Sequence, residues 1–208
     1  MKKILLLALL LILVFPLMAV TEGEWTFSSG WNIYGLMDNP YFLHSVPVSI
    51  GNEKYFNNTL FGIASEFNAY IPLFYMHGNL KSPDDAFTNY LYMDYALAAA
   101  VKWRSSHIDL FADIGWFVSL RFLYFSESRG LQLMLNSGPR MKIGMDMHLT
   151  DIFSLRLSCD GSLYVFRNDM LRPKSSRVGM FAMSITPELG FVVHFSDDWD
   201  FGRMWGRH

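Results

Sequence analysis

Apolar and polar residues alternate one by one along much of this 208-residue chain. In residues 108–124, every even-numbered position is apolar or aromatic, whereas the odd-numbered positions include Asp109, Asp113 and Arg121. Successive side chains of a β-strand point to opposite faces of the sheet, so a period of two predicts a strand with one apolar and one polar face. An α-helix would distribute the same charges around its circumference.

The same pattern recurs along the chain and predicts about eight strands. The expected strands are 25–33, 42–50, 61–73, 90–103, 108–124, 140–149, 153–165 and 181–195. The pattern is least regular in 42–50, because Pro47 cannot donate a hydrogen bond to a β-ladder.

The connections between these strands alternate between short and long. Short connections are expected at 51–58, 104–107 and 150–152, and longer ones at 37–40, 78–87, 126–139 and 167–177. Outer-membrane barrels have short periplasmic turns and longer external loops, so this assignment places both termini in the periplasm. The apolar cluster at 131–135 is either a contact surface or the upper end of strands that stand above the membrane.

The N-terminus has the features of a secretory signal peptide. Lys2 and Lys3 precede an apolar run from Ile4 to Phe15, and Ala19 supplies a small residue near the expected cleavage site. The run is shorter than the roughly 20 residues of a spanning helix. We therefore expect a signal peptide at 1–20, a barrel domain at 21–195 and a C-terminal tail or extra strand at 196–208.

Composition indicates that much of the surface does not meet water. Aromatic residues make up 16% of the chain and charged residues only 17%. The 19 acidic residues outnumber the 17 basic ones, which argues against a nucleic-acid partner. The single cysteine, Cys159, excludes an intramolecular disulfide.

The two faces of the strands differ in a way that indicates which one points outward. Small residues dominate the polar face, as suits a narrow lumen, whereas Trp25, Trp103 and Trp116 on the apolar face are too bulky for an eight-stranded interior. A soluble barrel would have the reverse orientation. Aromatic residues near the expected strand ends would form the membrane girdles: Trp25, Trp103, Phe153, Phe195 and Tyr124. The prediction is an all-β, antiparallel up-and-down transmembrane β-barrel in the outer membrane.

This pattern resembles the small eight-stranded bacterial outer-membrane proteins of the OmpA transmembrane-domain, OmpX and OmpW types. The most specific feature is the segment Leu189–Phe195, which is similar to the terminal strand signal of that family, in which alternate apolar positions end on an aromatic residue. The resemblance implies that the outer-membrane assembly machinery reads the strand ending at Phe195. The chain departs from the family pattern by continuing through 196–208.

Charged residues on the predicted polar face would meet inside the barrel. The predicted lumen charge network comprises Glu66, Asp94, Lys102, Asp109, Asp113, Arg121, Arg140, Lys142, Asp146, His148, Arg156, Asp160 and Glu188. An eight-stranded lumen is filled by side chains, and buried charges need partners, so we expect a salt-bridged plug. The alternative is a narrow pore lined by the same groups.

The polar residues allow two other interpretations. The sequence His194-Phe195-Ser196 is similar to the His-x-Ser of lipid A deacylases, with Asp197 and Asp198 nearby, but His194 is expected at the periplasmic end, away from lipid A. A metal site at Asp146, His148 and Asp160 would need three or four convergent ligands. We expect hydrogen-bonded histidines, no catalytic residue, no metal and no cofactor.

The expected function is therefore a non-catalytic outer-membrane barrel with a structural or surface-interaction role. The first alternative is a narrow pore or a small hydrophobic-compound transporter of the OmpW type, and the second is a lipid-modifying enzyme. The expected partners are outer-membrane lipids and the assembly machinery, with no nucleic acid and a monomeric state.

Overall fold

The computed structural model describes residues 22–36, 39–56, 59–77, 80–81, 89–125, 130–169 and 182–196. Its strands are β1 (Glu22–Gly30), β2 (Asn32–Leu36), β3 (Asn39–Tyr55), β4 (Phe61–His77), β5 (Leu80–Lys81), β6 (Asn89–Trp103), β7 (Ile108–Phe125), β8 (Gly130–His148), β9 (Phe153–Tyr164), β10 (Phe166–Asp169) and β11 (Ala182–Ser196). In these ranges no helix is both long and apolar enough to cross a membrane. The predicted signal peptide and, beyond Ser196, the predicted tail lie outside the described residues.

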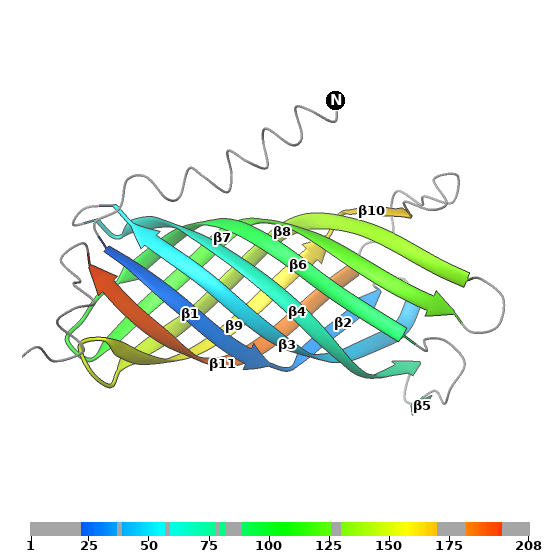
Figure 1. Cartoon of the computed structure of the whole chain (residues 1–208), viewed down its shortest axis with the longest axis horizontal. Coiled ribbons are helices and arrows are strands. Elements are labelled where there is room, and N and C mark those ends of the chain that lie inside the picture. Colours follow the sequence, from blue (N-terminus) through cyan, green and yellow to red (C-terminus); the bar gives the residue numbers. More distant parts are fainter. Residues whose placement is uncertain are drawn as a thin grey trace, which may run out of the picture.

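The strands form a closed antiparallel barrel (Figure 1). The β1–β2 pair is one strand interrupted at Trp31, and β9–β10 is one strand interrupted at Val165, while β5 is a two-residue segment paired with the end of β4. The sheet closes where β1 pairs with β11, from Glu22 opposite Ser196 to Gly30 opposite Glu188. Among the described residues, each of the eight long strands pairs with a neighbour on both sides, which is what hydrocarbon requires of a spanning sheet; β5 and β10, at the loop end, pair on one side only. The predicted eight-stranded up-and-down barrel is confirmed.

One end of the barrel, here called the turn end, carries three short connections together with the start of β1 and the end of β11. It lies on the left in Figure 1. Hydroxyl groups accept hydrogen bonds from backbone N–H groups in these turns: Thr59 from Phe61 at 3.2 Å, Ser105 from Ile108 at 3.2 Å and Thr150 from Phe153 at 3.0 Å. Such side-chain bonds stabilise tight turns. The opposite end is called the loop end.

Several sequence expectations about strand limits change. The expected loops 37–40, 78–87 and 167–177 are wrong for 39–40, 80–81 and 167–169, which belong to β3, β5 and β10. The expected strand 42–50 exists and is longer, because β3 covers 39–55, so the expected turn 51–58 is wrong for 51–55. The expected loop 126–139 is wrong for 130–139, which belongs to β8, and the alternative of an extended strand is confirmed there. In both cases turn-like polar residues concealed an alternation that continues to the end of the strand.

The exterior of the barrel is apolar. Outward positions carry large side chains that remain exposed, such as Ile114 at 63%, Phe191 at 57% and Trp116 at 51% of their full accessible surface. Inward positions of the same strands carry buried polar groups, including Asp113 and Ser119 on β7. A soluble barrel would have the opposite arrangement, so the predicted outward orientation of the apolar face is confirmed.

Aromatic residues ring the turn end as predicted. Trp25, Trp103 and Phe153 are exposed on the outside near this end. Phe195 is half-buried, because its ring lies over Gly23 of the neighbouring strand, where any Cβ would overlap it. The side chain of Tyr124 lies outside the described part of the chain.

Candidate functional site

All thirteen residues of the predicted lumen network lie on inward-facing positions. Eleven of them are buried. The side chain of Glu66 is 11% exposed and that of His148 is 25% exposed. Glu24 and Glu53 also face the lumen and were not predicted. Glu24 precedes the first expected strand and Glu53 fell in an expected turn; the alternation Gly51, Glu53, Tyr55 was the signal that could have placed Glu53.

The cluster nearest the turn end joins two cations to three carboxylates. Arg156 donates two hydrogen bonds to Asp146, from Nε to Oδ1 at 2.6 Å and from Nη2 to Oδ2 at 2.7 Å. It also donates to Glu53, while Lys102 contacts Glu24 and lies 2.8 Å from Asp146. These groups come from five strands and all are nearly or fully buried. Bidentate, charge-assisted bonds of this kind are the strongest hydrogen bonds that side chains form.

A second cluster lies further from the turn end. Lys142 Nζ is 2.6 Å from Glu66 and 2.7 Å from Glu188. Arg140 binds Glu66 and Asp160, so Glu66 accepts from both bases. The two clusters together place four cations against six carboxylates in a space from which water is largely excluded, which explains why each base has more than one acid partner.

Asp113 lies between the two clusters. It borders a cavity of about 20 Å³ that is also lined by Glu53, Glu66, Arg140 and Lys142. Its Oδ1 is buried and has no hydrogen-bond partner among the described residues. A cavity of this size has room for about one water molecule. The side chains around Asp113 therefore leave room for about one water molecule at this level of the lumen.

An aromatic layer fills the lumen towards the loop end. Its buried members are Tyr34, Tyr70, Tyr92, Phe117 and Tyr164. The Tyr70 and Tyr92 rings stack with centroids 4.0 Å apart, and the hydroxyls of Tyr92 and Tyr164 are hydrogen-bonded. The sequence pattern placed Tyr92 and Tyr164 on the polar face but did not show that five rings would converge at one level.

Two predicted network members bind this aromatic layer. Arg121 lies over the rings of Tyr34, Tyr92 and Tyr164, at 3.7, 4.2 and 4.7 Å from their centroids, which is cation–π geometry. Asp94 accepts hydrogen bonds from Asn68 at 2.7 Å, from Tyr70 at 3.0 Å and from Tyr92 at 3.1 Å. Within the described ranges no salt bridge reaches Asp94, so neutral donors hold it rather than the expected base.

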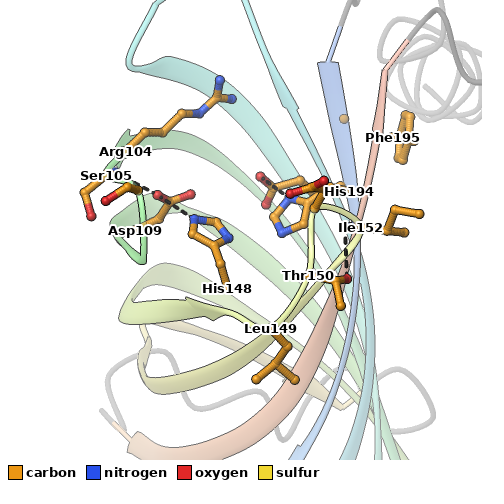
Figure 2. Close-up of a pocket in the computed structure, with 13 residues that line it drawn as sticks. Arg104, Ser105, Asp109, His148, Leu149, Thr150, Ile152, His194 and Phe195 are labelled. Carbon is orange, nitrogen blue, oxygen red and sulfur yellow. Dashed lines mark hydrogen bonds and ion pairs between the residues drawn. The ribbon is translucent and has the colours of Figure 1, made fainter.

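The turn end of the lumen opens into a cavity of about 630 Å³ (Figure 2). Glu24, Asp109, His148 and His194 line it. A continuous chain of contacts runs beneath: His148 Nε2 to Asp109 at 3.1 Å, His148 Nδ1 to Ser154 Oγ at 2.9 Å, Ser154 Oγ to His194 Nε2 at 2.7 Å and His194 Nδ1 to Glu24 at 3.2 Å. This chain crosses the seam where β1 and β11 close the barrel.

The same contacts resemble a Ser–His–acid triad, because Ser154, His194 and Glu24 follow one another at hydrogen-bond distance. Ser154 is 0% exposed, however, and its hydroxyl contacts two imidazoles. It is not presented to the cavity as a nucleophile. Phe195, which follows His194, points away from it on the other side of the strand (Figure 2).

The alternative of a metal site at Asp146, His148 and Asp160 also finds no geometric support. Asp146 binds Arg156 and Asp160 binds Arg140, so neither converges with His148. Across the described residues no group of three or more His, Cys, Asp and Glu side chains is placed to hold a metal ion. Ser196 has no described side chain, and Asp197 and Asp198 lie outside the described residues.

Comparisons with solved structures identify the architecture. Neisserial surface protein A is similar over 83% of this chain and 97% of its own length, with a TM-score of 0.61 and 10% identity. The attachment invasion locus protein Ail of Yersinia pestis is similar over 85% and 99%, with a TM-score of 0.53 and 12% identity. The outer membrane protein AlkL is similar over 88% and 95%, with a TM-score of 0.52 and 10% identity. No protein-family model and no curated protein matches the sequence.

At these identities the likeness concerns the fold. The chain has the architecture of the small outer-membrane β-barrels, as the resemblance at Leu189–Phe195 implied. The apolar exterior and the polar, filled lumen are the features that such a barrel needs in a membrane.

Proposed function

We propose that this outer-membrane barrel is non-catalytic and has a structural or surface-interaction role, with its lumen closed by an ion-paired and tyrosine-filled plug. The observation that supports the proposal is the order in which layers of side chains fill the lumen. The hydrogen-bonded chain of His148, Ser154 and His194 at the turn end is followed by two ion-paired clusters and then by the aromatic layer. The protein would then contact its partners through the outer surfaces of the barrel and would not conduct a solute through the lumen.

The strength of the plug follows from how its charges are paired. Removing one partner from a buried ion pair costs about 3–5 kcal/mol, because the remaining charge stays buried without compensation. The clusters share Glu66 between Arg140 and Lys142, and Asp146 between Lys102 and Arg156. Opening a water path would break several such contacts together, so thermal fluctuation does not open the lumen.

The test is single-channel current across planar bilayers containing the purified barrel. We expect no ion current from the native protein. The double variant Lys142→Ala with Glu66→Ala removes a base and an acid together beside the 20 Å³ cavity, and it should also stay closed, because the cluster around Arg156 and the aromatic layer still fill the lumen. A measurable conductance of the native protein that is abolished by blocking lumen residues would favour the narrow pore instead.

The same preparation separates the remaining alternatives. A transporter of small hydrophobic compounds should accelerate their entry into vesicles, and the accelerated entry should disappear when the aromatic layer is changed by Phe117→Arg. A lipid-modifying enzyme should alter the mass spectrum of lipid A or phospholipids incubated with the barrel. Neither effect is expected, and either one would refute the proposed role.

A further inference from the structure

The outer surface of the barrel has a groove near the turn end. Its volume is about 570 Å³, and Trp25 and Phe195 line it together with Phe67 and Tyr95. The groove arises where two neighbouring short side chains, Asn52 of β3 and Ser65 of β4, interrupt the belt of large apolar residues. Trp25 of β1, which pairs with Asn52 on its other side, forms one wall. It therefore crosses the strands β11, β1, β3, β4 and β6 on the face that meets lipid.

One wall of this groove carries an outward-facing charge. Lys54 lines the groove. Every other Asp, Glu, Lys and Arg with a described side chain in the strands lies on an inward position. A cation on the lipid face is costly within hydrocarbon and favourable where it can reach the interface. Lys54 is one residue from the end of β3, at the turn end, where that interface is expected.

The outward residues of β3 follow a chemical order along the strand. From the turn end towards the middle of the barrel they are Lys54, Asn52, Ile50 and Val48, which is charge, amide and then two apolar groups. Alternate residues are about 6.7 Å apart along a strand. A phospholipid presents phosphate, ester oxygens and acyl chain in the same order from the interface inward. On β4, Ser65 lies beside Asn52 and Phe67 beside Ile50, whereas apolar Ile63 lies beside Lys54, so the order holds along β3 and the polar level is shared by Asn52 and Ser65.

We propose that this groove binds one anionic phospholipid of the periplasmic leaflet. The Lys54 ammonium contacts the phosphate, and the side chains of Asn52 and Ser65 lie at the level of the ester oxygens. The acyl chain runs over Ile50 and Phe67, beside Tyr95. A volume of about 570 Å³ is that of a single small-molecule site, not of a docked helix. The proposal requires the membrane-spanning fold and is independent of whether the lumen conducts.

Native mass spectrometry of the detergent-solubilised barrel tests this site. The protein is incubated with phosphatidylglycerol or phosphatidylethanolamine at equal concentration, and the fraction carrying one lipid is measured. We expect one retained phosphatidylglycerol in excess of phosphatidylethanolamine. Lys54→Gln should reduce retention of phosphatidylglycerol about fivefold, the effect of about one basic residue at a membrane surface. Lys54→Arg should retain it, because the charge remains.

Two further variants separate the groove from general electrostatics. Arg104→Gln removes the same charge at the same end of the barrel, in an exposed turn outside the groove, and should leave retention unchanged. Ser65→Phe fills the groove while keeping Lys54, and should reduce retention of both lipids. Migration on unheated gels confirms that each variant is folded. Equal losses for Arg104→Gln and Lys54→Gln, or no loss for Ser65→Phe, would overturn the proposal.

Discussion

Replacing Arg156 with methionine should strongly destabilise the barrel. Arg156 is 1% exposed and donates four hydrogen bonds to the carboxylates of Glu53 and Asp146. Methionine keeps the apolar stem and removes every donor. Lys102 would then be the one lysine or arginine left beside Glu24, Glu53 and Asp146 among the described residues, so three buried carboxylates would share one permanent cation.

The expected loss is about 3–5 kcal/mol of unfolding free energy, the cost of removing one partner from a buried ion pair. At about 1.4 kcal/mol per factor of ten, the folding equilibrium constant should fall by a factor of about 100 to 5000. The loss is smaller than four separate charge-assisted bonds would suggest, because Arg156 itself no longer has to be desolvated.

The assay is urea unfolding of the barrel folded in phospholipid vesicles, followed by tryptophan fluorescence. Arg104→Met is the matched control, since Arg104 lies in an exposed turn, and it should change the unfolding free energy by less than about 1 kcal/mol. Adding Glu53→Gln to Arg156→Met should recover part of the loss by removing one uncompensated acid. A loss below about 1 kcal/mol for Arg156→Met, with an unchanged urea slope, would show that water solvates the lumen and would refute the plug.

Three further predictions follow from other parts of the barrel. Gly144→Ala should cost about 1–3 kcal/mol in the same urea assay, because a Cβ there would lie 2.7 Å from the Phe111 ring; an unchanged midpoint would contradict the packing. Cys159 is exposed on the apolar outer face, so a membrane-impermeant maleimide should fail to label it in vesicles. The control is Ser106→Cys in a Cys159→Ser background, which places the thiol in an exposed turn and should be labelled. Equal labelling of the two proteins would show that Cys159 lies in water. Ser154→Ala should cost about 1–3 kcal/mol in the urea assay, because it removes the buried hydroxyl that contacts both His148 and His194; an unchanged midpoint would contradict this hydrogen-bonded chain.

Alternation in the sequence was enough to predict the strands and their two faces. In 108–124 the carboxylates of Asp109 and Asp113 were assigned to the lumen and Ile114 and Trp116 to the exterior, as the structure has them. This information is local, because a period of two is a property of each strand by itself. The same reasoning extends to the eight-stranded fold, since closure is the way such strands avoid open edges in a membrane.

The partners of each charge were decided only by the tertiary structure. Lys102 contacts Glu24, 78 positions away along the chain, and Arg156 contacts Glu53, 103 positions away. Which residues meet across the lumen depends on the register of every strand pair and on the stagger of the closed barrel. A face assignment contains neither quantity. For this reason the sequence predicted that acids and bases line the lumen, whereas the structure alone showed the convergence of five aromatic rings beyond them and the outward groove beside Lys54.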